Sequence, residues 1–301
     1  MAQQKSSSRR RGTPSTPTFH VVESVELMLF LQAAMPHKNR DNIKTLLKDG
    51  QVLVDGDPVT KYNFTVNPGQ KVQLSRNKIA KQKTYRGISI VYEDSDIIVV
   101  NKHAGTLSVA TDNKEKHTAY TILYDHVKTK NPKGKIFVVH RLDRETSGLL
   151  VFAKSPQVQN ILQDNWNAMV RERTYFAVIE GVPEPPVGEI SSYLREAGDH
   201  KVYSSLSGDD GKYATTHYEM IKTTGSFSLL KLNLRTGRKN QIRVHLQDIG
   251  HPIVGDRKYG SVLNPIGRLA LHAGVLAFQH PVNQRELHFS ATIPRKFNEL
   301  V

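Results

Sequence analysis

The sequence predicts an α+β protein with a large mixed, mostly antiparallel sheet and a smaller α/β unit before it. Three observations predict this fold. In residues 88–301, β-rich runs outnumber helical ones and the connections between them are mixed. Residues 21–75 hold two helix patterns followed by short strand patterns. Between these parts, residues 76–87 are polar and basic without apolar periodicity, which is typical of a linker.

The small unit is predicted to contain two helices followed by short strands. Asp41 has the position and chemistry of an N-cap for the second helix, and Gly50 ends that helix. An Asp-Gly pair at residues 55–56 predicts a tight turn after the first strand. The predicted helices are residues 22–35 and 41–48, and the strand-and-turn stretches are residues 51–59 and 67–74.

The large unit is predicted to combine many strands with three helices. Ser155 and Pro156 form a helix start, because serine caps the N-terminus and proline fits the first turn. Gly250 closes a later, shorter helix. The predicted helices are residues 117–128, 155–169 and 239–248, and the β-rich runs lie within residues 87–102, 136–140, 149–154, 174–181, 218–222, 228–234, 268–278 and 286–292.

The positive charge of the chain is large and clustered. The 301 residues include 42 Lys+Arg and 28 Asp+Glu, which makes a formal net charge of +14. Such a chain is expected to have a polyanionic partner, and several separate basic runs favour contacts with phosphates. Residues 1–20 are predicted to be a disordered basic tail, with an organelle transit peptide as a minor alternative. The other basic runs are residues 38–48, 76–86, 128–135 and 235–243.

The composition also excludes several classes of protein and site. The chain has no cysteine, which excludes disulfides, thiolate nucleophiles, zinc fingers and iron–sulfur clusters. No run of about 18 apolar residues is present, which excludes a transmembrane helix. The first twenty residues lack an apolar stretch that could act as a signal peptide. We therefore expect a cytoplasmic protein without a membrane partner.

One polar loop carries the strongest candidate for chemistry. The stretch HRLDRETSG, residues 140–148, lies between two β-rich runs and holds Asp143 between Arg141 and Arg144. A carboxylate on a loop at the end of rigid strands can act as a nucleophile or base, and neighbouring cations would keep it ionised. By composition alone, a surface turn with a salt bridge explains the same residues.

The order of these residues resembles the signature of a known enzyme family. HRLDRETSGLLVFAKS, sixteen consecutive positions from His140 to Ser155, resembles the signature of the RluA family of pseudouridine synthases. Three further stretches resemble the same family in the right order. They are NKHAGTLSV at residues 101–109, RTYFAVIEG at 173–181 and LRTGRKNQIRVHLQDIGHPIVGDRKYG at 234–260. The resemblance covers residues 88–295 and implies a pseudouridine synthase fold and catalytic domain over residues 88–301.

The resemblance implies a catalytic role for three residues. Asp143 matches the family's catalytic aspartate, which makes it the expected nucleophile. Attack on the base, attack on the anomeric carbon and assistance to glycal formation all stay open as routes. Arg243 matches the arginine that pairs with that aspartate. Tyr175 matches a tyrosine that stacks on the target uracil and could assist the late removal of the proton from carbon 5.

RNA contacts are also implied around this loop. Arg141 matches the arginine that fills the space vacated when the target nucleotide leaves its stack. Asn240 stands where family members commonly have histidine, and asparagine forms hydrogen bonds but does not titrate near neutral pH. The other RNA-contacting residues expected in the catalytic domain are His140, which is also a candidate structural residue, Arg144, Arg238 and Gln241.

The N-terminal unit, residues 21–75, resembles the S4-type RNA-binding domain. The residues that carry this resemblance are Asn39, Arg40, Ile43, Leu47, Gly50, Val52, Val54, Gly56 and the NPGQKVQL ending. In that family, the basic second helix contacts structured RNA. The residues expected to do so here are Lys38, Arg40, Lys44 and Lys48. A small structural appendage is the alternative interpretation.

The predicted function is an RNA pseudouridine synthase that isomerises specific uridines, with large-subunit (23S) ribosomal RNA as the expected substrate. The alternatives are the same reaction on transfer RNA and a non-catalytic RNA-binding protein on this fold. A metal-dependent nuclease is disfavoured, because no carboxylate or histidine cluster has ligand spacing. The histidines at issue, His251, His272, His280 and His288, are scattered. We expect no metal, no cofactor and a monomer.

Overall fold

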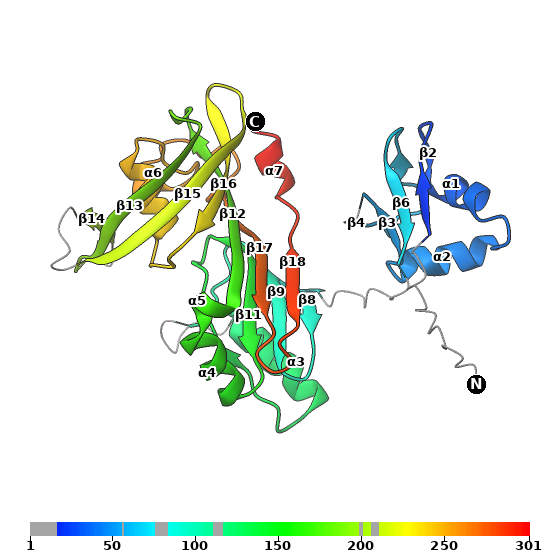
Figure 1. The fold of residues 1–301 in the computed structure, drawn as a ribbon, viewed down its shortest axis with the longest axis horizontal. Helices are drawn as coiled ribbons and strands as arrows, with labels where there is room; N and C mark the ends of the chain where they lie inside the picture. Colours follow the sequence, from blue (N-terminus) through cyan, green and yellow to red (C-terminus); the bar gives the residue numbers. More distant parts are fainter. Residues whose placement is uncertain (1–16, 56, 76–83, 111–116, 199–200, 206–210) are drawn as a thin grey trace, which may run out of the picture. The chain divides into compact units, whose positions relative to one another are not determined.

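The chain folds as two units, residues 1–82 and 83–301. The computed structural model describes residues 17–55, 57–75, 84–110, 117–198, 201–205 and 211–301 (Figure 1). Most of the predicted tail and most of the predicted linker lie outside the described residues. At both places the structure is more extensive than predicted, because Thr18–His20 form strand β1 and Thr84–Tyr85 form strand β7.

The first unit pairs two short helices with short antiparallel strands. One sheet has the order β1-β6-β3-β4, and β2 pairs with β5. Leucine, isoleucine and valine side chains from both helices and these strands form one buried cluster. The remaining elements are β2 (Val25–Glu26), α1 (Leu27–Ala34), α2 (Arg40–Lys48), β3 (Val52–Val54), β4 (Asp57–Pro58), β5 (Thr65–Val66) and β6 (Lys71–Leu74).

Two predicted helix boundaries in this unit were wrong. The first helix begins at Leu27 instead of residue 22, because Val25–Glu26 pair as a strand with Thr65–Val66. The N-cap of α2 is Asn39 instead of Asp41. The Asn39 side chain accepts a hydrogen bond from the Asn42 amide at 2.8 Å, while Asp41 already lies in the first helical turn. In the first turn, the negative charge of Asp41 interacts favourably with the positive end of the helix dipole.

The second unit is built on one twelve-stranded sheet (Figure 1). Its main path runs β14-β13-β15-β16-β12-β17-β11-β9-β8-β7, with β10 beside β11 and β18 beside β17. The described pairings are antiparallel except for β11 with β17, so the predicted mixed, mostly antiparallel sheet is confirmed. The strands not yet bounded are β8 (Ile88–Glu93), β9 (Ile97–Lys102), β10 (Phe137–Val138), β11 (Ser147–Ala153), β12 (Val170–Glu180), β13 (Val187–Glu196), β14 (Val202–Ser205), β15 (Lys212–Thr223), β16 (Phe227–Leu234), β17 (Leu271–Gln279) and β18 (Glu286–Ser290).

Helices cover the two ends of this sheet. Helix α6 packs against β13, β14 and β15, while α4 and α5 lie beside β11 and β12 (Figure 1). Ser155 caps α4 as predicted, since its hydroxyl accepts a hydrogen bond from the Val158 amide at 3.2 Å. The bounds are α3 (Ala119–Lys130), α4 (Pro156–Asp164), α5 (Trp166–Met169), α6 (Gln241–Asp248), the 3₁₀ turn η1 (Arg257–Tyr259) and α7 (Arg295–Asn298).

Three predicted elements differ in length. The predicted helix over 155–169 is divided at Asn165, which separates α4 from α5. Helix α6 begins at Gln241 instead of residue 239, because Asn240 has a left-handed backbone conformation, with φ of 55°. The strand predicted at 136–140 is reduced to Phe137–Val138, and the chain then leaves the sheet.

The one parallel pairing brings two strands unusually close at Gly148. This glycine pairs with Lys102 of β9 on one side and with Ala273 of β17 on the other. It has φ of +119°, and an added Cβ would lie 2.2 Å from the Ala273 carbonyl oxygen. Only glycine fits there. The glycine therefore allows β11 to start directly beside β17, which places the preceding loop above the middle of the sheet.

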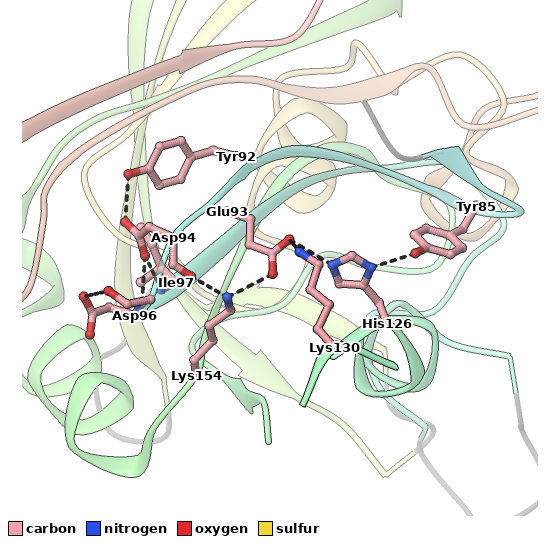
Figure 2. A network of polar contacts seen from close by, with 10 residues as sticks. Tyr85, Tyr92, Glu93, Asp94, Asp96, Ile97, His126, Lys130 and Lys154 are labelled. Atoms are coloured by element: carbon pink, nitrogen blue, oxygen red, sulfur yellow. Dashed lines mark hydrogen bonds and ion pairs between the residues drawn. The ribbon is translucent and has the colours of Figure 1, made fainter. Parts of the chain in front are cut away.

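A polar network fastens α3 to the sheet (Figure 2). The Glu93 carboxylate at the end of β8 accepts hydrogen bonds from His126 Nε2 at 2.9 Å, Lys130 Nζ at 2.7 Å and Lys154 Nζ at 2.9 Å. The other ring nitrogen of His126 lies 2.7 Å from the Tyr85 hydroxyl. Burial alone would raise the pKa of Glu93, but these three partners outweigh it and lower the pKa to about 2.

The Glu93 network predicts a defined loss of stability in acid. A carboxylate whose pKa falls from 4.5 to about 2 on folding stabilises the native state above pH 4.5, and this contribution is lost as the pH falls toward 2. We expect Glu93→Gln to cost about 2 kcal/mol at pH 7 and to flatten the pH dependence of the unfolding free energy across this window. Urea unfolding at a series of pH values measures it.

The matched control for that experiment is Glu299→Gln, which removes an exposed carboxylate paired with Arg295 on one helical turn. Exposed pairs contribute little. The same slope between pH 4.5 and 2 in Glu93→Gln and in the unmodified chain would contradict the role given to Glu93.

Candidate active site

The loop that carries Asp143, residues 139–146, is held in place from below by β9. Lys102 is fully buried at the end of β9, and its Nζ donates to the carbonyl oxygens of Thr106 at 2.7 Å and Arg144 at 3.0 Å. The Gly105 amide donates to the same Arg144 carbonyl at 2.9 Å. Lys102 therefore ties the Asp143 loop to the turn that follows β9.

A second pair of hydrogen bonds holds Leu142, the residue next to Asp143. The Ser108 hydroxyl donates to the Leu142 carbonyl oxygen at 2.7 Å and accepts from the Leu142 amide at 3.0 Å. The Leu142 side chain is buried in the core beneath the loop. These contacts fix the backbone on one side of Asp143 and leave its carboxylate 35 % exposed.

The charge of Lys102 is part of the environment of this loop. Burial lowers the pKa of Lys102 to about 8, while the nearby carboxylates of Asp143 and Glu145 raise it and Arg268 lowers it. The ammonium group thus stays protonated near neutral pH, with donors for the loop carbonyls.

Arg243 of α6 faces Asp143 from across the sheet. Its Nη1 lies 3.7 Å from Asp143 Oδ2, which is the ion pair that the sequence predicted. A second carboxylate holds the arginine more tightly. Asp256 accepts hydrogen bonds from Arg243 Nε and Nη2, both at 2.7 Å, and the Asp256 side chain is only 1 % exposed. This two-point geometry is the strong form of an arginine–carboxylate pair.

Asn240 and Tyr259 complete the binding environment of the Arg243 guanidinium. Asn240 Oδ1 accepts a hydrogen bond from Nη1 at 3.1 Å, and Asn240 Nδ2 donates to the Tyr259 hydroxyl at 3.0 Å. The guanidinium carbon lies 4.7 Å from the centre of the Tyr259 ring, in cation–π contact. Burial lowers the pKa of Arg243, but Asp256, with smaller help from Asp143 and Tyr259, outweighs this and raises it. Arg243 is thus a fixed positive charge.

Tyr175 of β12 lies at the junction of the two main cores of the second unit, and its side chain packs against both. Burial raises the pKa of the Tyr175 phenol to about 12. Arg173 lowers it and the Asp143 carboxylate raises it further. The phenol is therefore neutral near pH 7. The core cluster against which Tyr175 packs includes Leu142, the residue that precedes Asp143.

The comparisons with known proteins agree with this geometry. The model of the family described as RNA pseudouridylate synthase matches residues 96–248, and the S4 domain model matches residues 27–72. An uncharacterised RNA pseudouridine synthase of Bacillus subtilis is 33 % identical over 281 residues, which are 90 % of this chain and 91 % of the relative. The chain belongs to the RNA pseudouridylate synthase family.

Further relatives and a solved structure extend the comparison. The ribosomal large subunit pseudouridine synthase D of Vibrio cholerae is 31 % identical over 279 residues, which cover 87 % of this chain and 86 % of that protein. The structure of human RNA pseudouridylate synthase domain containing 4 matches with a TM-score of 0.58 and 25 % identity, over 71 % of this chain and 90 % of that one. This pseudouridylate synthase is thus an isomerase that acts on RNA, with an S4 domain at its N-terminus.

The residues predicted around the Asp143 loop have different surroundings. Arg141 is exposed, and among the described residues it has no hydrogen-bond or ion-pair partner. Arg144 is exposed too, and its carbonyl holds Lys102. His140 packs against Trp166, with ring centres 4.6 Å apart, and its Nε2 accepts from the Val151 amide. Burial, with a smaller effect of Arg173, lowers the pKa of His140 to about 3, so the ring is neutral and structural.

Two residues near α6 that were predicted to contact RNA form hydrogen bonds within the protein, and one of them, Gln241, is buried. Gln241 is 2 % exposed, and its amide group donates to Thr215 and Thr216 and accepts from Thr236 and Arg238. The side chain of Asn240 accepts a hydrogen bond from Arg243 and donates one to Tyr259. Both residues are bound to protein atoms that support the site, and Arg238 itself is exposed.

The first unit presents the predicted basic helix face. Arg40, Lys44 and Lys48 are exposed at four-residue spacing on α2, along a line next to the buried Ile43 and Leu47. Lys38 is half-buried before the helix, and Lys44 lies 3.6 Å from Asp41. The stripe is thus a solvent-facing cationic surface on an otherwise well-packed unit.

The described residues contain one group with the geometry of metal ligands, Asp94, Asp96 and His280, whose ligand atoms lie within 4.8 Å of one another. The Asp94 carboxylate already accepts hydrogen bonds from the Asp96 and Ile97 amides, from Tyr92 and from His280. These contacts hold the turn between β8 and β9.

Among the helices of the described residues, none is long and apolar enough to cross a membrane.

Sequence reasoning missed Asp256 and Lys102 as parts of the site. Both lie within stretches that carried the family resemblance, GDRKYG and NKHAG. The available signal was their place in these stretches. Their partners lie 13 and 42 residues away, in Arg243 and Arg144.

Substitution of Asp256 should lower the catalytic rate, although Asp256 itself is buried and does not contact RNA. In Asp256→Asn, Arg243 loses a charged two-point partner and shifts away from Asp143. A displacement of about 1 Å at a reacting centre can cost about 100-fold in rate. We expect the single-turnover rate constant to fall by that order while the Kd for RNA stays within about twofold.

Asp248→Asn, at the exposed end of the same helix, is the control and should leave the rate near that of the unmodified enzyme. Because loss of a buried partner also destabilises the fold, the rates are compared well below the unfolding midpoint of each variant. A wild-type rate in Asp256→Asn would show that Arg243 does not need this anchor.

Proposed function

We propose that this enzyme converts specific uridines of large-subunit ribosomal RNA to pseudouridine, with Asp143 as the nucleophile. The observation that carries the proposal is the partly exposed Asp143 carboxylate, 3.7 Å from an Arg243 guanidinium that is itself anchored by buried Asp256. A carboxylate held this way is aimed and accessible, which nucleophilic catalysis requires. The ribosomal substrate is supported by the S4 domain and by the relatives named for the ribosomal large subunit.

The reaction rearranges bonds within one nucleotide and consumes nothing. The bond between N1 of uracil and C1′ of ribose breaks, the base turns, and a new bond forms between C5 and C1′. C5 then releases its proton to solvent, and N1 takes up one proton. The balance needs no oxidant, reductant or metal. Attack of Asp143 on the base or on C1′, or its assistance to glycal formation, begins from the same ionised carboxylate.

Arg243 and Tyr175 have supporting roles in this proposal. Arg243 pairs with the Asp143 carboxylate and fixes its direction. Tyr175 offers its ring as a stacking surface for the flipped uracil. A phenol whose pKa is about 12 is a poor base near pH 7, so we assign Tyr175 to stacking and assign removal of the C5 proton to another base.

The RNA itself is held by exposed cations. Arg141 is assigned to the space vacated by the target uridine, which is supported by its exposure two residues before Asp143. Arg144 and Arg238 are assigned to phosphates near the site, and Lys38, Arg40, Lys44 and Lys48 of the S4 domain to phosphates of a structured RNA region. We further propose a cytoplasmic monomer that needs no cofactor.

Tritium release tests the reaction, the nucleophile and the substrate together. We expect the full chain to release tritium from large-subunit ribosomal RNA transcribed with 5-tritiated uridine, in the presence of EDTA. Asp143→Asn should lower the rate by at least about 1,000-fold, because a neutral amide is not a nucleophile, and should leave RNA affinity nearly unchanged.

Glu145→Gln is the matched control, since it neutralises an exposed carboxylate two residues away in the same loop. Substantial activity in Asp143→Asn would refute the nucleophile. Release from pooled transfer RNA but not from ribosomal RNA would move the substrate assignment to transfer RNA.

A further inference from the structure

The outward face of helix α3 carries an aromatic and basic stripe that the proposed reaction does not use. Tyr120, Tyr124 and Lys128 follow one another at four-residue spacing, so they lie along one side of the helix. The two tyrosine rings are nearly parallel, with centres 6.2 Å apart and an angle of 20°. Lys128 Nζ lies 5.3 Å from the centre of the Tyr124 ring. Tyr124 is 37 % exposed although it belongs to a well-packed helix.

A hollow opens beside this stripe. It has a volume of about 370 Å³ and is lined by Tyr120 and Tyr124, by Lys135 and the adjoining strand β10, and by Gln159 of α4. Gln159 Nε2 donates to the Val138 carbonyl at 2.8 Å, which fixes the wall formed by β10. The volume is within the range of sites for small organic groups. The walls offer flat aromatic surface, while polar groups stand at the edge.

The charge around the hollow is mainly positive. Lys133 and Lys135 are exposed in the segment that follows α3, and Lys128 lies at the end of the stripe. Lys130 is not available, because it is paired with Glu93 on the inner side of the helix (Figure 2). Asp125 is the exposed carboxylate on the outer side of α3. Lysines are depleted from protein–protein interfaces, whereas they are typical of surfaces that contact phosphates.

The stripe is rigidly connected to the Asp143 loop. The Tyr120 amide donates to the Ser108 carbonyl oxygen at 3.1 Å, and the Ser108 hydroxyl is bonded to both backbone groups of Leu142. The opposite side of α3 is fixed to the sheet through His126 and Glu93 (Figure 2). An RNA strand bound along α3 would therefore be held in a fixed position relative to Asp143.

We propose that the hollow beside α3 binds an unstacked nucleotide of the substrate RNA, outside the uridine that reacts. The base lies against Tyr120 and Tyr124, and Lys128 and Lys135 contact the neighbouring phosphates. Stacking on aromatic side chains is the main source of affinity for single-stranded RNA and tolerates any base. This inference rests on the proposed function for the identity of the RNA, but not on Asp143 as the nucleophile.

Removal of the Tyr124 ring tests the site by affinity. The probe is a fluorescein-labelled single-stranded RNA of twelve uridines, titrated with the full chain and followed by anisotropy. Tyr124→Ala should weaken the Kd about tenfold, as expected for the loss of one stacked base. Tyr124→Phe keeps the ring and should bind within twofold of the unmodified chain. Tyr203→Ala, which removes a tyrosine 44 % exposed on β14, is the matched control. Equal affinity of Tyr124→Ala and the control would overturn the proposal.

A fluorescence signature separates stacking from simple attraction of charge. The chain has a single tryptophan, Trp166, so Tyr124→Trp adds one new emitter whose signal is obtained by comparison with the unmodified chain. The RNA should quench this signal, while inorganic polyphosphate, which has charge but no bases, should not. No quenching by RNA, or equal quenching by RNA and polyphosphate, would show that the hollow does not bind a base. The surface would then bind a protein partner or no partner. Neither measurement depends on turnover. The nucleotide site and the proposed reaction are therefore tested independently, the reaction by tritium release.

Discussion

The two-point contact between Arg243 and the buried Asp256 is the interaction on which the active site depends. It fixes the guanidinium plane, so that the remaining nitrogen reaches Asn240 and faces Asp143. A buried carboxylate of this kind is unfavourable unless it is fully paired, which Arg243 provides. Asp256 thus determines where the positive charge of the site lies, although it does not face the solvent.

The other half of the site is fixed by a similar principle. Lys102, buried below the Asp143 loop, and Ser108, beside it, bind backbone groups on both sides of the aspartate. Gly148 then lets β11 pass close to β17, so the loop sits directly over the sheet. The Asp143 carboxylate can remain partly exposed because the groups that position it are buried. Preorganisation here comes from residues that would never touch the RNA.

Much of the fold followed from local patterns, and the failures have physical reasons. Ser155 is predictable as a cap because its chemistry is local, whereas Asn39 competes with Asp41, which has equally suitable cap chemistry two residues later. The motif identified Asp143, Tyr175 and Arg243 together. It could not reveal that Asp256 is the hydrogen-bonded partner of Arg243, or that Gln241 points inward, because those contacts depend on how α6 packs on the sheet.

We propose that Asp256 acts on catalysis only through Arg243, and a double-mutant cycle measures whether this is so. Single-turnover rates are measured for Arg243→Lys, Asp256→Asn and the combined variant. Lysine cannot form the two-point contact, so we expect the combined variant to be no slower than Arg243→Lys, within about twofold. If the two losses in rate multiply instead, Asp256 acts on the reaction independently of Arg243, which contradicts this proposal.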